Sequence, residues 1–384
     1  MKKFLCLLFP LLLIFCLSAC SGTSPASTDP YEDVTLPPVT TTAAPETTAA
    51  PETTLPPEET TGEPEETEQA PEGQYFHPLT GLLCEKDFSL LRPVAVMINN
   101  IPDALPQAGV SQADVMYECL VEGGFTRMMM VVSDYEPISV IGSVRSSRDY
   151  FLDMAANHDA IYVHAGGSPM AYAGIRDRFI NNIDGVNMYT PNTFYRDPER
   201  LKSYSLEHTL MTSGSGIADG IAYLGYRTEK SADYPSPFNF VPYGEKAPEG
   251  DRAAVHIEIP YSYIQGSSFE YHADDGLYYK FHNGNPHIDY INGEQLAYTN
   301  LLILFCNQTY YNDAYGRIDL EYTGGGTGFY ITDGKAREIK WHRYDRDAVM
   351  ELKNTDDTPL VINRGKTFVA IAPTTVESIV SIGE

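Results

Sequence analysis

Apolar residues in the first half of the chain fall into short runs separated by polar or glycine-rich stretches. Residues 94–98 form a continuous apolar run of strand length, and residues 115–121 form a second run that ends before Gly123 and Gly124. A third run covers residues 128–132. The periodicity of the second run fits either a strand or a helix, and we favour a strand. Because the glycines separate it from the third run, we predict a β-hairpin over this stretch.

A further strand and a helix are predicted downstream of this hairpin. The polar residues 134–137 precede a β-branched run at 139–144, a pattern that indicates strand, turn and strand. A helical pattern begins at Asp149 and continues for about ten residues. Its inward positions are Tyr150, Phe151, Met154 and Ala155.

The apolar run at residues 161–164 predicts a strand that ends at a pair of glycines. Ser168 is then a typical N-cap followed by proline, which favours a helix over residues 170–179. Another helix is predicted from Ser213 onward, with Gly225 at its end. Strands that alternate with helices predict an α/β or α+β N-terminal domain with a mixed sheet.

The pattern changes after about Asp251, where strand-length runs follow one another without helices between them. The predicted strands cover residues 254–259, 278–281, 301–305, 317–322, 328–332 and 366–372. Short turns separate these runs, which predicts a smaller, β-rich C-terminal domain of the sandwich or partial-barrel type. Residues 324–328 are rich in glycine but lack the lysine of a phosphate-binding loop, so we predict a hairpin turn there.

The first twenty residues have the pattern of a secretory leader. Lys2 and Lys3 precede an apolar stretch over residues 4–17, which is too short for a stable membrane span. The Leu-Ser-Ala-Cys box that follows resembles the bacterial lipobox. This resemblance implies that Cys20 becomes the first residue of the mature protein and carries the acyl chains of a durable membrane anchor. The alternative is a transmembrane anchor with an unmodified cysteine.

Residues 21–74 are rich in Thr, Pro, Glu and Ala and repeat the motif A-A-P-E-T-T. A segment of this composition cannot bury a core, and its prolines and like charges keep it extended. At up to ~3.1 Å per residue, such a tether could reach ~100 Å or more. A stalk that spans the cell wall and a spacer without a specific role both fit this segment.

Without the leader and the tether, about 310 residues remain, which is enough for two domains of ordinary size. We therefore divide the chain into a leader (1–20), a disordered tether (21–74), an N-terminal domain (75–240) and a C-terminal domain (251–384). A stretch rich in Pro and Gly, residues 235–250, links the two domains.

The formal net charge of the chain is −26, and it is unevenly distributed. The leader contributes two positive charges and the tether twelve negative ones, so the remaining residues carry −16. This charge argues against a nucleic-acid partner, because duplex binding depends on neutralising phosphates. Cys84, Cys119 and Cys306 form no C-x-x-C pair, so we expect buried thiols rather than a zinc ribbon or a redox motif.

Three arginines lie close in sequence to the point where predicted strands end and a helix begins. Arginine binds phosphate or carboxylate through two parallel hydrogen bonds and keeps its charge. A helix N-terminus adds N–H donors and a favourable dipole. We therefore predict an anion-binding site that consists of Arg127, Arg145, Ser146, Arg148, Asp149, His164, Gly166 and Gly167.

Other interpretations of these residues stay open. Arg145, Arg148 and Asp149 could form a salt-bridged corner that ties strand to helix, and His164 could be a packed histidine. A divalent cation or a general base is a further option, with Glu118, Glu122, Asp149 and His164 as candidates. The sequence does not name a catalytic residue, a metal or a cofactor.

Several longer motifs resemble the YerB family of bacterial lipoproteins. These are H-P-L-T-G-L, R-P-V-A-V-M-I-N-N, S-Q-A-D-V-M-Y-E, I-G-S-V-R-S-S-R-D-Y-F and L-E-H-T-L. The segment from Y-Y-K-F-H-N-G-N-P-H-I-D to F-V-A-I-A-P resembles that family's C-terminal domain. The likeness covers nearly all of residues 75–384 and implies an extracytoplasmic lipoprotein with two domains. It supplies no activity, catalytic residue or ligand.

Residues 126–149, followed by Y-V-H-A-G-G-S, are also similar to the core of LytR-CpsA-Psr phosphotransferases. These enzymes transfer lipid-carried glycopolymers onto peptidoglycan. The resemblance would match Arg145 or Arg148, together with Asp149, to the arginine–aspartate pair of those enzymes. Met128 stands where they usually have an aspartate, and this departure weakens the case for magnesium-assisted chemistry.

Three hypotheses about function follow. The first is a lipid-anchored binding protein on the extracytoplasmic face of the cell membrane, whose N-terminal domain binds an anionic envelope ligand such as a cell-wall glycan or a polyprenyl phosphate. The second is a diverged phosphotransferase that moves a lipid-linked phospho-glycopolymer to the cell wall. In the third, both domains only mediate contacts with other proteins.

Overall fold

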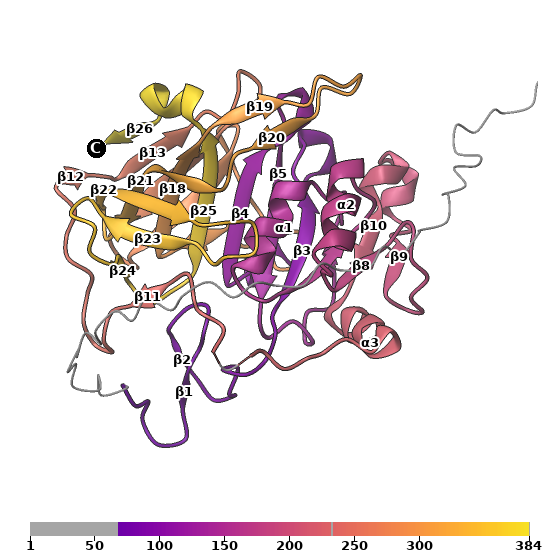
Figure 1. The fold of residues 1–384 in the computed structure, drawn as a ribbon, viewed down its shortest axis with the longest axis horizontal. Helices are drawn as coiled ribbons and strands as arrows, with labels where there is room; N and C mark the ends of the chain where they lie inside the picture. The colour runs from indigo at the N-terminus through magenta and orange to yellow at the C-terminus, as the bar shows by residue number, and fades with distance from the viewer. Residues whose placement is uncertain (1–67, 232, 384) are drawn as a thin grey trace, which may run out of the picture. The chain divides into compact units, whose positions relative to one another are not determined.

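The computed structural model describes residues 68–231 and 233–383. The leader, Cys20 and most of the tether lie outside this part of the chain, so what we expect of them stays a prediction. Within the described residues, strands outnumber helices and gather around one large sheet (Figure 1).

The first half of the described chain supplies five neighbouring strands of this sheet. In spatial order they are β4 (Val115–Leu120), β5 (Thr126–Val132), β3 (Val94–Asn99), β7 (Ile161–His164) and β8 (Asn182–Asp184). β5 lies antiparallel to both β4 and β3, whereas β3, β7 and β8 are mutually parallel. The predicted hairpin and the mixed sheet are therefore confirmed.

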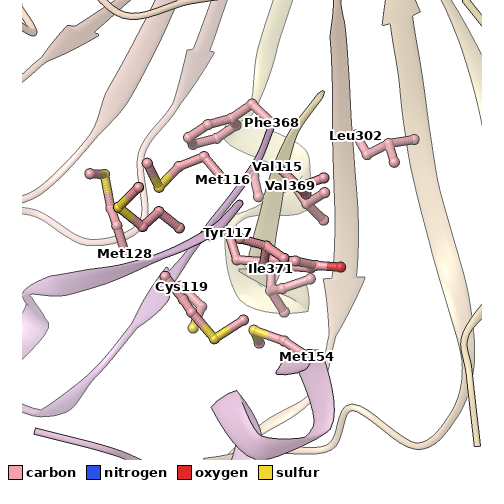
Figure 2. Close-up of a cluster of buried hydrophobic side chains, with 14 of the residues drawn as sticks. Val115, Met116, Tyr117, Cys119, Met128, Met154, Leu302, Phe368, Val369 and Ile371 are labelled. Atoms are coloured by element: carbon pink, nitrogen blue, oxygen red, sulfur yellow. The ribbon is translucent and has the colours of Figure 1, made fainter. Parts of the chain in front are cut away.

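Side chains pack on both faces of the central strands. All residues of β3, β4 and β5 are buried, which explains why their sequences are apolar without alternation. Figure 2 shows Met154 beside Cys119 on one face of β4 and Phe368 beside Met116 on the other. Met154 belongs to α1 (Asp149–Ala156), which Figure 1 shows in front of the sheet.

The helix starts predicted from the sequence are confirmed. α2 (Pro169–Asp177) begins after Ser168, whose Oγ accepts a hydrogen bond of 3.1 Å from the Ala171 N–H. α3 (Gly214–Leu224) begins after Ser213, which caps it in the same way, and ends at Gly225 with a φ of 66°. Short 3-10 helices complete the helical elements: η1 (Pro102–Ala104), η2 (Val110–Gln112), η3 (Glu122–Gly124), η4 (Arg200–Lys202), η5 (Leu206–His208) and η6 (Thr374–Ile379).

The strand predicted over residues 139–144 is wrong for most of its length. Only β6 (Ile141–Gly142) is a strand, and it pairs with β10 (Leu210–Thr212) rather than with β5. A third strand, β9 (Phe194–Arg196), completes this small sheet. The residues after β6 turn away because the main chain of Arg145 inserts at the end of the large sheet. Its N–H donates to the Met97 carbonyl at 2.9 Å, and its carbonyl accepts from the Ala165 N–H at 3.0 Å.

The second half of the chain continues the same large sheet. Beyond β4 the order is β25 (Thr367–Pro373), β18 (Asn300–Cys306), β21 (Gly324–Thr332), β22 (Lys335–Arg343) and β12 (Arg252–Ala253), and β23 (Glu351–Asn354) also pairs with β22. β25 runs parallel to β4, with Thr367 opposite Val115 and Ile371 opposite Cys119. The boundary between the two predicted domains stays a prediction, and one sheet crosses it.

A second sheet belongs to the C-terminal half alone. Its order is β16 (Asn285–Pro286), β15 (Leu277–His282), β14 (Ser267–His272), β13 (His256–Ile259) and β26 (Ser381–Gly383), with β17 (Ala297–Tyr298) beside β15. Three strand pairs are separate: β1 (Tyr75–Phe76) with β2 (Leu83–Cys84), β11 (Asn239–Phe240) with β24 (Val361–Ile362), and β19 (Gln308–Tyr310) with β20 (Ile318–Leu320).

Aromatic side chains fill the space between the two sheets. The ring of Phe368 on β25 lies 4.9 Å from that of Phe269 on β14 and 5.2 Å from that of Tyr298 on β17, measured between centroids. Burying a side chain of this size contributes about 1.5–3 kcal/mol each. The predicted fold class, a mixed-sheet N-terminal part and a β-rich C-terminal part, is confirmed.

The hairpin turn predicted at residues 324–328 is wrong, because these glycines lie inside β21. A Cβ atom at Gly326 would lie 2.5 Å from the Phe305 carbonyl oxygen and 2.6 Å from Nε1 of Trp341. Trp341 is buried and donates from Nε1 to that carbonyl at 3.0 Å. The glycines therefore permit the close approach of an indole ring to the strand.

Candidate functional site

The strand order brings the predicted site residues to one edge of the large sheet. The register places Arg127 of β5 opposite Asn99 of β3, and His164 of β7 beside Asp184 of β8. Residues 145–148 cross this edge, and the Ser147 N–H donates to the Gly166 carbonyl at 2.9 Å. We call the six residues Arg127, Arg145, Ser146, Arg148, Gly166 and Gly167 the arginine edge.

Two of the three arginines share one carboxylate. The Nε atom of Arg148 donates to Glu122 Oε2 at 2.9 Å, and its Nη2 atom also contacts Glu122. Nη2 of Arg127 lies 3.9 Å from Glu122 Oε1, while its Nη1 donates to the Ser146 carbonyl at 2.9 Å. Both arginine side chains are 8% exposed. Burial lowers the pKa of Arg127 to about 10, so it stays charged at neutral pH.

Arg145 lies at the surface of this edge. Its side chain is 22% exposed, and its Nη2 atom lies 3.2 Å from Oε2 of Glu207, which is half exposed. An ion pair between partly exposed groups of this kind contributes little to stability, about 0–1 kcal/mol. Among the three arginines, Arg145 is therefore the one that could exchange its partner for a ligand at the lowest energetic cost.

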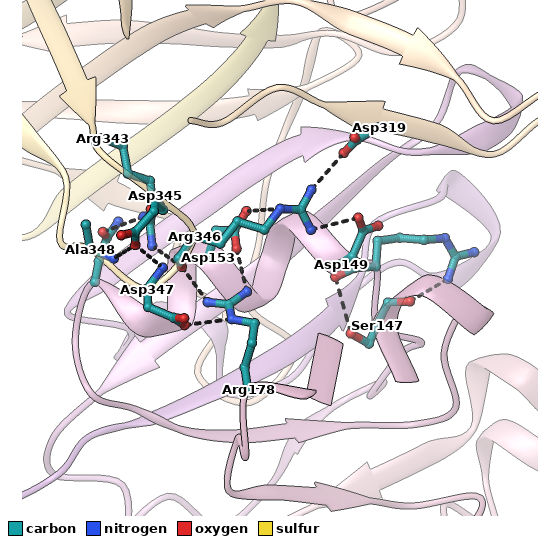
Figure 3. Close-up of polar contacts among 12 residues, drawn as sticks. Ser147, Asp149, Asp153, Arg178, Asp319, Arg343, Asp345, Arg346, Asp347 and Ala348 are labelled. Atoms are coloured by element: carbon teal, nitrogen blue, oxygen red, sulfur yellow. Dashed lines mark hydrogen bonds and ion pairs between the residues drawn. The ribbon is translucent and has the colours of Figure 1, made fainter. Parts of the chain in front are cut away.

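Asp149 does not pair with the arginines of this edge. Its Oδ2 atom accepts from the Tyr311 hydroxyl at 2.8 Å and from Arg346 Nη1 at 3.1 Å, as Figure 3 shows for Arg346. Both partners come from the C-terminal half of the chain. Arg346 also bridges to Asp319 at 3.4 Å, so Asp149 takes part in the contact between the two halves.

The His164 ring lies beneath the arginine edge, whereas Gly166 and Gly167 present backbone atoms at its surface. The His164 ring is fully buried, with Nδ1 at 2.8 Å from the Gly166 carbonyl oxygen and Nε2 at 3.1 Å from Asn182 Oδ1. Gly166 adopts a φ of 74° and donates its N–H to Asp184 at 2.7 Å. Because Gly166 and Gly167 are partly exposed, backbone atoms rather than the imidazole reach the surface here.

Four cavities of the described residues are lined by residues outside the arginine edge. One of about 510 Å³ lies between the β1–β2 segment and residues 289–292, with His77, Asp114 and Lys366 in its wall. Another, of about 540 Å³, lies beside the end of β15. Within residues 68–231 and 233–383, no group of three or more His, Cys, Asp or Glu side chains is arranged to hold a metal ion.

A buried ion pair between the two halves was not predicted from the sequence. Nζ of Lys280 on β15 lies 3.2 Å from Oε2 of Glu118 on β4, and neither side chain is exposed to solvent. Oγ of Ser267 donates to Glu118 at 2.7 Å and accepts from Lys280 at 2.7 Å. A sequence signal for this pair does exist. Alternate side chains of a strand point to the same face, so Lys280 and His282 of β15 both point inward.

The three cysteines among the described residues are free thiols. Cys119 and Cys306 are buried, and Cys84 is half-buried. Burial raises the pKa of Cys306 to about 12 and that of Cys119 well above its usual value, so neither is a reactive thiolate at neutral pH. No helix among the residues described here is both long and apolar enough to cross a membrane.

Two family models match the chain in the order of its two halves. The model "Protein of unknown function (DUF3048) N-terminal domain" matches residues 79–227, and the C-terminal domain model of the same family matches residues 257–369. The chain belongs to this family. The YerB relatives reported next confirm the resemblance seen in the sequence motifs.

Two comparisons agree with this assignment. The Bacillus subtilis (strain 168) protein named "Putative lipoprotein YerB" is 28% identical over 317 residues, which cover 80% of this chain and 89% of that protein. A crystal structure of the YerB protein from Bacillus subtilis matches with a TM-score of 0.70 and 26% identity, over 81% of this chain and 100% of that one. The YerB fold is therefore shared along nearly the whole described part.

Proposed function

We propose that this protein is a lipoprotein of the extracytoplasmic membrane face, anchored through acylated Cys20, which binds an anionic cell-envelope ligand at the arginine edge. The leader pattern and the named lipoprotein relative support the anchor. The ligand would be a cell-wall glycan that carries phosphate or carboxylate groups, or a polyprenyl phosphate. Asp149 and His164 would support the edge without contacting this ligand, because both side chains are buried and have internal partners.

The observation that carries this proposal is the charge at the edge. Arg127 and Arg148 bring two positive charges, and Glu122 is the carboxylate that they share, so about one positive charge is left over. This local positive charge contrasts with the formal net charge of −16 that the residues outside the leader and the tether carry together. A buried cation without a full counter-charge is costly, and an anionic ligand would relieve that cost.

Backbone groups at the same place would add to anion binding. α1 begins at Asp149 with Arg148 as its N-cap residue, and the Arg148 side chain makes no capping hydrogen bond. Free N–H groups and the helix dipole favour negative charge at this end. Ser146, Gly166 and Gly167 are partly exposed beside it and leave room for a close approach.

The test is calorimetric titration of the full chain in detergent with inorganic pyrophosphate and with a short-chain polyprenyl phosphate. We expect Arg145→Ala to weaken binding by about 10- to 100-fold, the size of a charge-assisted hydrogen bond, and Arg145→Lys to weaken it less. Glu122→Gln should strengthen binding, because it removes the carboxylate that competes with the ligand. Arg176→Ala is the matched control, since Arg176 is a 73% exposed arginine on α2 that pairs with Asp177.

Absence of heat with both anions would contradict the proposal. So would equal losses in the Arg145→Ala and Arg176→Ala variants, because that result indicates only general charge attraction. The phosphotransferase hypothesis would use the same edge, and no contact of the described residues favours it over simple binding. It would gain support only if pyrophosphate were released from a lipid-linked donor in the presence of magnesium.

A further inference from the structure

The cavity of about 510 Å³ beside the β1–β2 segment has an acidic and a basic side chain in one wall. β4 and β25 are parallel neighbours, as Figure 1 shows, and their first paired residues are Val115 and Thr367. Asp114 and Lys366 directly precede these two residues, so the register places them side by side where the strands begin. Both line the cavity, which we call the Asp–Lys cavity.

The two charges of this pair do not neutralise each other. Nζ of Lys366 donates to the Ser111 carbonyl at 2.5 Å and forms no ion pair with a described residue. Oδ2 of Asp114 accepts from the Ser133 N–H at 2.8 Å and lies 3.6 Å from Nε2 of His77. Burial lowers the pKa of His77, so its ring is neutral at pH 7 and supplies no counter-charge to Asp114.

Both groups are held partly away from water and keep free bonding capacity. The Asp114 side chain is 14% exposed, and Lys366 is half-buried. Burial raises the pKa of the Asp114 carboxyl and lowers the pKa of the Lys366 ammonium. Within the described part of the chain, Oδ1 of Asp114 and two of the three N–H donors of Lys366 have no partner. A ligand that supplies the opposite charges would therefore be stabilised here.

The other two carboxylates in the wall already have partners. Asp134 forms an ion pair of 3.2 Å with Lys86. The two carboxylate oxygens of Asp289 accept hydrogen bonds of 2.8–3.0 Å from three main-chain N–H groups. Asp114 and Lys366 are therefore the opposite charges that this wall leaves for a ligand.

We propose that the Asp–Lys cavity binds an α-amino acid with an apolar side chain, with its ammonium at Asp114 and its carboxylate at Lys366. Such a molecule carries both charges close together, which suits two residues in adjacent strand positions. Apolar side chains also line the cavity: Leu82, Phe88, Val132, Ile138 and Ile291. They offer a surface for the side chain of the ligand. The volume lies within the usual range of small-molecule sites, about 300–1,000 Å³.

The experiment is calorimetric titration of the full chain in detergent with leucine and two of its derivatives. Leucinamide lacks the carboxylate, and N-acetylleucine lacks the ammonium. We expect leucine to bind, and each derivative to bind at least about tenfold more weakly, because each leaves one of the two buried charges without its partner. This comparison uses the natural chain, so it does not depend on how well a variant folds.

Two variants assign the charges to their residues. Lys366→Met keeps the aliphatic stem and removes the ammonium, so it should weaken leucine binding about tenfold and make leucine and leucinamide bind equally. Asp114→Asn keeps an acceptor for the Ser133 N–H and should remove the difference between leucine and N-acetylleucine. Lys340→Met is the matched control, because Lys340 is 44% exposed and pairs with Asp357 outside this wall.

The proposal does not depend on the arginine edge, and Arg145→Ala should leave leucine binding unchanged. It is overturned if leucine gives no heat with the folded natural chain at millimolar concentrations, or if all three ligands bind that chain equally well. An equal loss of leucine binding in Lys340→Met and Lys366→Met would also overturn it, because the loss would then not come from the cavity.

Discussion

The pKa of a single side chain depends on both its burial and the charges around it, and Asp153 of α1 shows which of the two effects is larger. Its side chain is 1% exposed, and its Oδ1 atom lies 2.6 Å from Nη1 of Arg178 (Figure 3). Burial raises the pKa of Asp153 to about 6, even though Arg346, Arg343 and Arg178 all act to lower it. Desolvation therefore outweighs three guanidinium groups at this position.

Asp153 predicts a pH dependence of stability. Its pKa rises from about 3.8 in the unfolded chain to about 6 in the folded one, so the folded state binds more protons between these values. By linkage, this group stabilises the fold most below about pH 4, and the contribution is lost as the pH rises to about 6. We expect Asp153→Asn to remove a change of up to about 3 kcal/mol over this window.

The measurement is urea unfolding at several pH values between 4 and 7, with the free energy of unfolding of the variant compared with that of the natural chain. Asp347→Asn is the control, because Asp347 also pairs with Arg178, at 2.8 Å, but is 72% exposed. A constant difference between Asp153→Asn and the natural chain across the whole window would show that Asp153 does not titrate there.

At the scale of elements, the sequence predicted helices and strands correctly where a capping residue or an apolar run of strand length marked the element. Ser168 and Ser213 start helices as predicted, and the apolar run at residues 161–164 is a strand over its whole length. The failures have a physical cause in neighbouring elements. Residues 139–144 have strand composition, but Arg145 is held between β3 and the residues after β7. The glycines at 324–328 have turn composition, but Trp341 needs the space above them.

Gly326 gives a test of this explanation. Gly326→Ala places a methyl group against the Phe305 carbonyl and the indole of Trp341, so the strand or the ring has to move. We expect the free energy of unfolding to fall by about 1–3 kcal/mol, the usual cost of overpacking. The midpoint of urea unfolding measures this cost. Gly383→Ala in β26 is the control, because its added methyl would meet nothing within 4 Å, and it should change stability by at most about 0.5 kcal/mol.

On the scale of the described part of the chain, the two halves share one sheet and one hydrophobic core. β25 pairs with β4 over five residue pairs, and the ion pair between Glu118 and Lys280 is buried between the halves. Separating the halves would expose a fully buried edge of β4 and leave these charges apart. Such a structure is expected to unfold as one cooperative unit rather than as two domains.

This expectation can be checked with the single tryptophan. Trp341 lies in the C-terminal half, so its fluorescence reports on that half. Circular dichroism near 222 nm is weighted toward α-helices, and α1, α2 and α3 lie in the N-terminal half. We expect both probes to give the same urea midpoint. Phe368→Ala, which removes a ring between the two sheets, should lower both midpoints together, at a cost of about 3–5 kcal/mol. Two separate transitions, or a shift in only one probe, would contradict a shared core.

The sequence by itself determined the elements that depend on near neighbours: the capped helices, the apolar strands, the hairpin at Gly123 and Gly124, and the leader and tether patterns. It also placed the arginines close to one another, because they lie within 22 residues along the chain. Only the tertiary structure decided that Glu122 lies beside two of them, that β25 pairs with β4 and that Lys280 forms an ion pair with Glu118. These partners are chosen by strand register and by the fit of side chains across long sequence separations, and a local pattern of polar and apolar residues carries no record of either.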